Sequence, residues 1–187
     1  MLFRSQGYDI IGGGLNIAKA DLTLSSSNVT KTYDGTLSAA GTAVAAAGTA
    51  LLGGDTASGG SFAFADKNAG SGNKTVTAAG VTVNDGNGGN NYNVSYADNT
   101  TSTINKANLT LSTSNVTKTY DGTTSATGAV VVTAGTVFAG DSATGGTFAF
   151  TDKNAGTGNK TVTTASKVGR VARTRLKAYD HMRISPG

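Results

Sequence analysis

The chain of 187 residues contains no cysteine, no tryptophan and no glutamate, and it has a single histidine and a single proline. Without cysteine it can form neither a disulfide nor a thiolate metal site. One histidine and no glutamate leave no side chains for a nucleophile–base pair or a glutamate acid–base pair. We therefore expect that the protein is not an enzyme and that it holds no cofactor, and we assign no residue to a metal site.

Long apolar runs are missing as well, and no stretch of about 20 apolar residues could span a membrane. The N-terminal sequence lacks the apolar segment of a signal peptide, so we expect any export signal to lie outside this chain. Apolar residues make up 37% and charged residues 14% of the chain, against averages of about 45–50% and about 25%. Small residues fill the difference, and they suit exposed strand faces and tight turns.

The net charge of +4 comes from the ends of the chain. Residues 19–163 hold eight lysines and nine aspartates, a net charge of −1. Residues 166–187 carry four of the five arginines, together with the only histidine and the only proline. We interpret this segment as an atypical basic tail outside the repeat, either a frameshifted or recombined end or a mispredicted reading frame; the sequence does not decide whether the tail is genuine. Tyr179 is the one aromatic residue among its arginines, so the indication of nucleic-acid binding is weak and we expect none.

An internal repeat organises the chain. LTLSSSNVTKTYDGT (22–36) recurs at 109–123 with one difference, and GGSFAFADKNAGSGNKTVT (59–77) recurs at 145–163 with three. The offset falls from 87 to 86 between these blocks, so one residue is deleted in the variable region between them. We divide the chain into the end of a preceding repeat (1–18), a complete repeat 1 (19–105), a truncated repeat 2 (106–165) and the tail (166–187). The chain thus resembles a fragment of a longer tandem array.

Apolar and polar residues alternate with a period of two in DLTLS, SFAFA and NYNVSY, which predicts β-strands. Glycine-rich and Asp-Gly segments separate these stretches as turn signals. We predict an all-β fold of tandem small antiparallel β-sandwich (Ig-like) modules of about 87 residues. A β-grasp-like module remains the alternative, because strand order cannot be read from this sequence.

Two motifs recur in both repeats. In TYDGT, Asp-Gly predicts a hairpin turn, and we expect the tyrosine to bury its ring and to place its hydroxyl on a backbone partner. In FAFxDKNAGxGNKTV, we expect the phenylalanines in the core and a turn at DKNAG. The residues selected as structural are Tyr33, Asp34, Gly35, Tyr120, Asp121, Gly122, Asp66, Asn68, Gly70, Asp152, Asn154 and Gly156.

Calcium binding is a weaker interpretation of the same motifs and of NDGNGGNN (84–91). Each motif offers few oxygen ligands, and the loop matches neither the twelve-residue calcium loop nor a nonapeptide array. We therefore predict turns and strand connections at these positions, and the sequence leaves calcium binding open.

These motifs resemble the YDG repeat domain of large bacterial surface proteins. The resemblance rests on KADLT and KANLT at the repeat boundaries, VTKTYDGT, FAFxDKNAGxGNKTVT and the closing NYNVSY. Such repeats occur in filamentous-haemagglutinin-like adhesins, often exported by two-partner secretion. The resemblance implies a secreted or cell-surface protein with a role in cell adhesion, in which neighbouring repeats contact one another as a stalk or spacer. Alternatively, each repeat itself binds a host glycan or protein.

Overall fold

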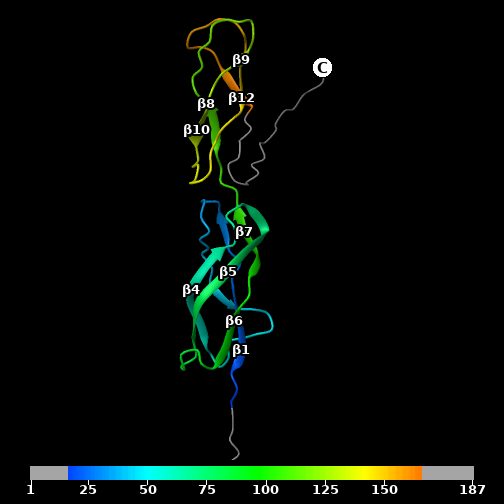
Figure 1. Cartoon of the computed structure of the whole chain (residues 1–187), viewed down its shortest axis with the longest axis vertical. Helices are drawn as coiled ribbons and strands as arrows, with labels where there is room; N and C mark the ends of the chain where they lie inside the picture. Colours follow the sequence, from blue (N-terminus) through cyan, green and yellow to red (C-terminus); the bar gives the residue numbers. More distant parts are fainter. Residues whose placement is uncertain (1–16, 166–187) are drawn as a thin grey trace, which may run out of the picture.

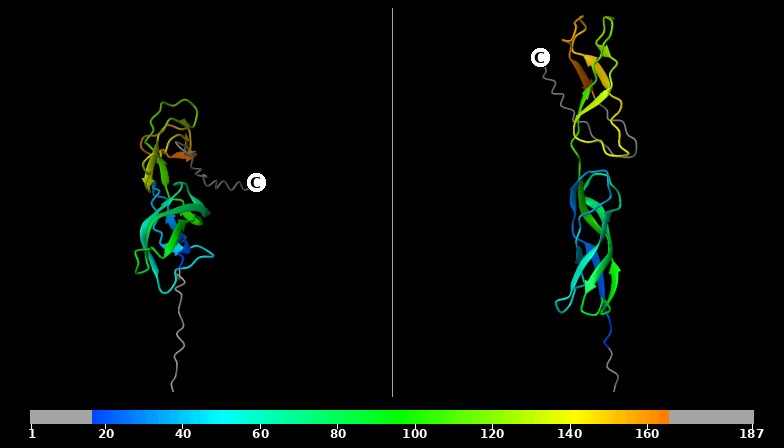
Figure 2. Two further views of the ribbon diagram at one scale, coloured as in Figure 1. Left: turned by 60° about the horizontal axis from the view of Figure 1, so that its bottom comes forward. Right: turned by 90° about the vertical axis from the view of Figure 1, so that its left-hand side faces the viewer.

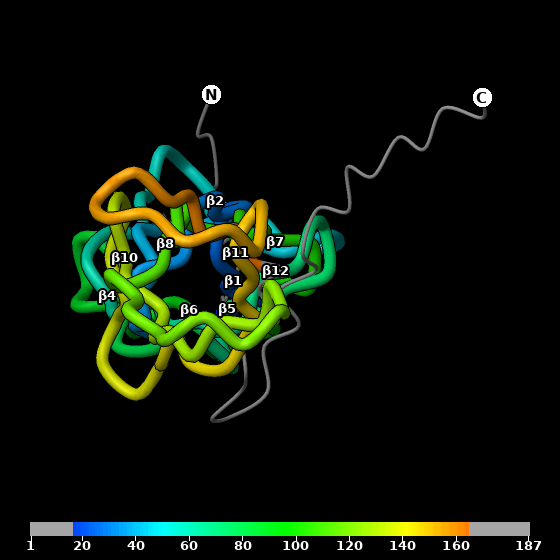
Figure 3. Tube along the Cα trace, turned by 90° about the horizontal axis from the view of Figure 1, so that it is seen from above, coloured from blue at the N-terminus to red at the C-terminus, as the bar shows by residue number. Residues whose placement is uncertain are grey.

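The computed structural model describes residues 17–165, and these residues form strands, turns and loops without a helix. The prediction of an all-β chain is therefore confirmed for them. Repeat 1 and repeat 2 lie end to end along the longest axis (Figure 1), joined by residues 106–109. Seen along that axis, the strands of repeat 2 lie over those of repeat 1 (Figure 3). The basic tail falls outside the described residues.

Repeat 1 forms two sheets, with strand orders β3-β1-β6 and β2-β7-β5-β4. Its strands are β1 (Ala20–Ser26), β2 (Thr30–Thr32), β3 (Ala43–Ala45), β4 (Thr56–Phe64), β5 (Gly70–Asn84), β6 (Tyr92–Tyr96) and β7 (Asn99–Asn105). The first two strands follow each other in sequence but belong to different sheets, so the chain changes sheets near Val29.

The pairing in these sheets is mixed. β4 and β5 form a long antiparallel hairpin, and β5 is antiparallel to β7. In contrast, β1 runs parallel to β6, and β2 runs parallel to β7. The prediction of purely antiparallel sheets is therefore wrong for these two pairs. No helix packs on either sheet within residues 17–165, so the helical element of a β-grasp-like module is absent there.

The core of repeat 1 consists of two clusters. The first packs between the two sheets and contains Leu22, Leu24, Val83 and Tyr92. The second contains Val29, Ala39, Phe64, Val76 and Ile104, and Tyr33 packs against it. Each cluster includes one residue of the last two strands, Tyr92 of β6 in the first and Ile104 of β7 in the second. The core is therefore complete only when these closing strands are in place.

β5 contributes to both clusters because its middle is bent. Val76 and Val83 are separated by an odd number of positions, which would place them on opposite faces of a regular strand. Gly80 in β5 has a φ of 65°, and the neighbouring position in β4, Gly60, has a φ of 91°. Glycine tolerates this left-handed conformation. The alternation of side chains is therefore interrupted in both strands at this point, and Val76 and Val83 both face inward. The Gly-Gly of GGSFAF is thus a requirement of the core.

Repeat 2 copies part of this scheme. Its strands are β8 (Thr110–Thr113), β9 (Ser125–Ala126), β10 (Val130–Ala134), β11 (Thr147–Phe150) and β12 (Val162–Ala165). They form sheets with the orders β10-β8 and β12-β11-β9. The described part of repeat 2 has no counterpart of β6 or β7, and none of its described side chains is buried. Phe150 is only half-buried, whereas its counterpart Phe64 is 1% exposed.

Candidate functional site

The Tyr-Asp-Gly turn of repeat 1 crosses from one edge of the four-stranded sheet to the other. β2 precedes the turn and pairs with β7 at one edge. Ser38 follows the turn and pairs with Ala63 of β4 at the other edge. Asp34 and Gly35 therefore do not connect two paired strands, and the predicted hairpin is wrong. The turn instead leads the chain over the cluster that contains Phe64.

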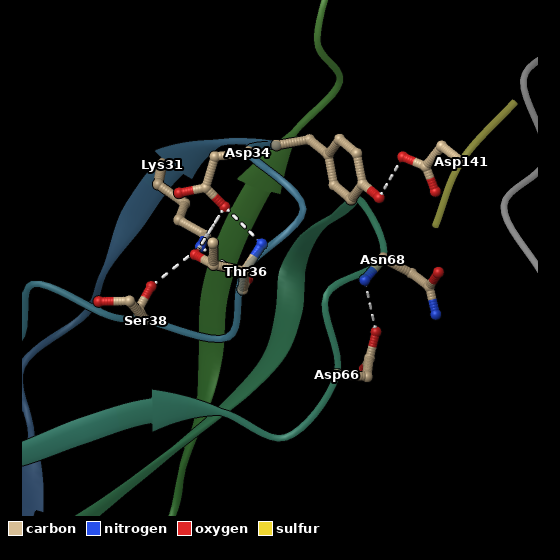
Figure 4. Close-up of polar contacts among 8 residues, drawn as sticks. Lys31, Asp34, Thr36, Ser38, Asp66, Asn68 and Asp141 are labelled. Atoms are coloured by element: carbon tan, nitrogen blue, oxygen red, sulfur yellow. Dashed lines mark hydrogen bonds and ion pairs between the residues drawn. The ribbon is translucent and has the colours of Figure 1, made fainter. Parts of the chain in front are cut away.

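The ammonium group of Lys31 stabilises this turn by hydrogen bonds to three of its residues (Figure 4). Its Nζ donates to Oδ1 of Asp34 at 2.8 Å and to the carbonyl oxygens of Thr36 and Ser38, each at 2.9 Å. An ammonium has three donors and no acceptor, so these oxygens satisfy it. Nζ also lies 5.4 Å from the ring centroid of Phe64, within the range of a cation–π interaction. Lys31 thus ties the turn to the core.

The carboxylate of Asp34 is committed to the turn. Its Oδ1 accepts hydrogen bonds from the backbone N and from Oγ1 of Thr36, both at 2.9 Å. The hydrogen bond from Lys31, followed by that from the Thr36 amide, lowers the pKa of Asp34 to about 2. Asp34 is therefore a turn-forming group, and its oxygen is already occupied by protein donors.

Repeat 2 forms the same turn. Nζ of Lys118 donates to Asp121 Oδ1 at 2.7 Å and to the carbonyl oxygens of Thr123 and Ser125 at 2.8 and 2.9 Å. The hydrogen bond from Lys118 is the main cause that lowers the pKa of Asp121 to about 2. Gly122 has a φ of 76°, close to the 77° of Gly35. Since repeat 2 has no buried core in its described part, the turn is largely a local structure.

A second lysine–aspartate contact closes the turn between β4 and β5. Oδ1 of Asp66 accepts hydrogen bonds from the backbone N of Asn68 at 2.8 Å and from Nζ of Lys74 at 2.5 Å. Lys74 is buried, and a buried ammonium needs such a partner. A Cβ on Gly70 would overlap Oδ1 of Asn73, so the Asn73 side chain would have to move if Gly70 were replaced.

The corresponding turn of repeat 2 has the same hydrogen bonds. Oδ1 of Asp152 accepts hydrogen bonds from the backbone N of Asn154 at 2.9 Å and from Nζ of Lys160 at 2.5 Å. A Cβ on Gly156 would collide with Asn159. The hydrogen bond from Lys160 lowers the pKa of Asp152.

The aspartates of these turns were predicted from the sequence, but the lysines that bind them were not. Each lysine keeps its spacing in both repeats: three positions before the aspartate of TYDGT and eight positions after the aspartate of DKNAG. This repeated spacing between opposite charges was the available signal.

The tyrosines of the two Tyr-Asp-Gly turns have different surroundings. Tyr33 is half-buried and donates its hydroxyl to Oδ2 of Asp141 in repeat 2 at 2.6 Å. Its ring meets that of Phe138 edge-on, with centroids 5.6 Å apart. Tyr120, at the far end of repeat 2, is 61% exposed. Neither tyrosine is the buried corner with a backbone partner that the sequence suggested.

Tyr92 comes closer to that description, although sequence analysis did not select it. This residue of β6 is buried. Its hydroxyl accepts a hydrogen bond from the Leu52 amide at 2.8 Å and donates one to Asp55 at 2.6 Å. The bond to Asp55 raises the pKa of Tyr92. Tyr92 thereby ties a closing strand to the loop before β4.

The loop 84–91 is organised by its single aspartate. Asp85 accepts backbone hydrogen bonds from Asn87, Gly89 and Asn91 at 2.8, 2.7 and 3.0 Å. These hydrogen bonds lower the pKa of Asp85, and the one from Gly89 has the largest effect. Within residues 17–165, no three His, Cys, Asp or Glu side chains come together in a way that could hold a metal ion. The carboxylate therefore serves as the centre of a backbone loop.

One open cleft of about 620 Å³ lies between the edge strands β3 and β4. Gly59, Gly60 and Phe62 line one side, and Gly41 and Thr42 line the other. No charged side chain lines it. Its hydroxyl groups and its phenylalanine are the types of group that could contact a neutral polar ligand.

Comparison with known proteins assigns the family. A sequence model of the YDG domain matches residues 18–102 and 105–171. The chain belongs to the YDG domain family. No curated protein and no solved structure matches it. Each YDG module thus has one clamped Tyr-Asp-Gly turn, hereafter the YDG turn. No helix among the described residues of these modules could cross a membrane.

We expect the aspartates of both YDG turns to titrate near pH 2 in an NMR titration of their carboxyl carbons. A pKa lowered from 3.8 to about 2 means that each clamp stabilises the fold above about pH 4 and that this contribution is lost as the pH falls toward 2. In a Lys31→Met variant, the pKa of Asp34 should rise toward 3.8, while that of Asp121, the internal control, should not change. A pKa of Asp34 that stays near 2 without Lys31 would refute the clamp.

Proposed function

We propose that this chain is a structural and adhesive repeat segment of a large bacterial cell-surface or secreted adhesin, in which YDG modules act as a stalk or spacer. The direction of the chain through repeat 1 carries the proposal. Because the first strands, β1 and β2, run parallel to the last strands, β6 and β7, the chain enters the module at one end and leaves it at the opposite end. The next module then follows along the same axis (Figure 2), so each added module adds length.

We further propose that each complete YDG module is an Ig-like sandwich of about 87 residues. The split of the first strand between the two sheets, as β1 and β2, supports this. So does the cluster that packs between the sheets around Leu22 and Val83. A sandwich of this kind suits a spacer because it folds as a separate unit and presents few unpaired strand edges at its ends.

The extracellular setting is proposed from composition and from the family resemblance. Surfaces rich in threonine and asparagine, the low content of charged residues and the lack of cysteine suit a bacterial exported array. The resemblance to filamentous-haemagglutinin-like proteins adds two-partner secretion as the export route. The alternative function is that the module itself binds a host glycan or protein, and the cleft beside Phe62 is the place where such binding is proposed.

Replacement of the array separates the two functions. In the full-length surface protein, the YDG modules would be deleted or exchanged for an equally long array of unrelated β-modules. For a spacer, we expect the deletion to abolish attachment to host cells and the exchange to preserve it. If the exchanged protein attaches as poorly as the deletion, the YDG modules themselves bind the host and the spacer proposal is wrong.

A further inference from the structure

The YDG turn of repeat 1 is in contact with the following module. Tyr33 donates its hydroxyl to Asp141 at 2.6 Å and packs its ring edge-on against Phe138. Nζ of Lys67 lies 3.8 Å from Oδ1 of the same aspartate. The pKa of Tyr33 is raised to about 12, mainly by burial of the ring and next by the hydrogen bond to Asp141. The ring and hydroxyl of Tyr33 and the ammonium of Lys67 thus contact one loop of repeat 2.

Gly35 is the residue that allows this approach. Its φ is 77°, and a Cβ at this position would lie 2.8 Å from Cβ of Phe138. Gly122 has the same backbone conformation, but a Cβ added there would meet no atom within 4 Å. The glycine of the YDG turn therefore has a second role at the joint, in addition to its backbone conformation.

The loop that docks on Tyr33 occurs in both modules. Phe138–Asp141 corresponds to Leu52–Asp55 in repeat 1. Both loops close through the same hydrogen bond, from the aspartate amide to the carbonyl oxygen of the apolar residue, at 2.9 Å. Each module thus has an apolar-x-Gly-Asp loop, which we call the docking loop, and a YDG turn that can receive one.

Within residues 17–165, one docking loop and one YDG turn are unoccupied. Tyr120 at the far end of repeat 2 is 61% exposed, and Leu52 in repeat 1 is 55% exposed. Lys153, the counterpart of Lys67, is also exposed. The free YDG turn offers the same aromatic ring, hydroxyl and cation as the occupied one, and the free loop offers an apolar side chain and a carboxylate.

We propose that the YDG turn is a docking site for the next module of the array, so that the exposed face around Tyr120 binds the docking loop of a further YDG module. The observed joint between repeat 1 and repeat 2 supplies the geometry. Such a contact joins two different surfaces head to tail, and it can continue without closing. This gives a linear array with one repeated joint.

The docking loop can bind a YDG turn while it stays attached to its own module. In repeat 1, Tyr92 occupies Oδ2 of Asp55. Oδ1 of Asp55 accepts no hydrogen bond from a described residue, and a carboxylate oxygen has room for one from the tyrosine of a preceding module. A complete module can therefore use its aspartate for closure and for docking together.

The short linker sets the affinity that this joint needs. Modules on a short linker meet at an effective concentration of about millimolar. A joint that is occupied in the linked chain therefore needs a dissociation constant near or below about 1 mM between unlinked copies. The proposal rests on the spacer function for its purpose, but the contact can be tested separately. If the contact between modules forms but has no effect on adhesion, the spacer function is wrong and the docking contact still stands.

The test is an NMR titration of the ¹⁵N-labelled full chain with unlabelled full chain up to a few millimolar. We expect concentration-dependent shifts around Tyr120 and Lys153 at one end and in the Leu52–Asp55 loop at the other. Tyr120→Ala and Leu52→Asp should each weaken association at least about tenfold. Val44→Asp, at a similarly exposed apolar residue of repeat 1 away from both ends, should leave it unchanged.

Two results would overturn the proposal. One is the absence of shifts at either end at these concentrations. The other is association that persists in both Tyr120→Ala and Leu52→Asp, because the copies would then meet through a different surface. Both substituted side chains are largely exposed, so each variant should fold, and the ¹⁵N spectrum of each variant reports this directly.

Discussion

Backbone amides of β1–β7 are expected to exchange with deuterium at least about a thousandfold more slowly than those of β8–β12, if repeat 1 has the stability of an ordinary domain. Repeat 1 buries two apolar clusters, and both include residues of its closing strands. The described part of repeat 2 has neither closing strand and no buried side chain. Its amides should therefore open at a lower cost in free energy than those of repeat 1.

The repeat supplies an internal control for this experiment. Residues 22–36 and 109–123 differ at one position, so the intrinsic exchange rates of the two segments are nearly equal. Any difference between them reports the protection that the surrounding structure gives. Equal protection of the two segments would mean that repeat 2 closes its core by other means, and it would refute the role assigned to β6 and β7.

Truncation of the core phenylalanine of repeat 1 is the second large effect. Phe64 is 1% exposed and packs with Val76 and Ile104. Phe64→Ala should lower the free energy of unfolding of repeat 1 by about 3–5 kcal/mol, because a buried phenylalanine leaves a large cavity. This is a large part of the stability of a small domain. Urea denaturation followed by tyrosine fluorescence would measure the change.

Phe150→Ala is the matched variant in repeat 2. Phe150 occupies the same position of the motif but is only half-buried, so its truncation should change the main unfolding transition by less than about 1 kcal/mol. If both variants shift this transition equally, the two repeats unfold as one unit with equivalent cores. The assignment of the stable core to repeat 1 would then be wrong.

The repeat can be read from the sequence itself, and the strands and the positions of the turns could be predicted because their signals are local. Alternation around Leu22 and Phe64 indicates strands, and the glycines mark places where the backbone turns. The parallel pairing of β1 with β6 could not be predicted, because it joins segments 72 positions apart through backbone groups that any sequence carries. Strand direction in a pair of that kind depends on the whole fold.

The candidate site was predicted in part for a similar reason. The Asp-Gly of the YDG turn is a local signal, whereas the role of Tyr33 depends on Asp141, which lies 108 positions later. The lysines lay within reach of sequence analysis, since Lys31 and Lys118 keep the same spacing to their aspartates. Attention to opposite charges that recur at one spacing in the two copies would have found both clamps.

Two YDG modules are expected to form one end-to-end unit that is held together by Tyr33. The chain has no cysteine, so spin labels on Ser61→Cys and Ser112→Cys would report one distance between exposed strands of the two modules. Pulsed electron–electron resonance should give a single narrow distance distribution. Tyr33→Phe should broaden it, and Tyr120→Phe should leave it unchanged. A broad distribution in the protein with both tyrosines intact would contradict the claim, since the modules would then move independently.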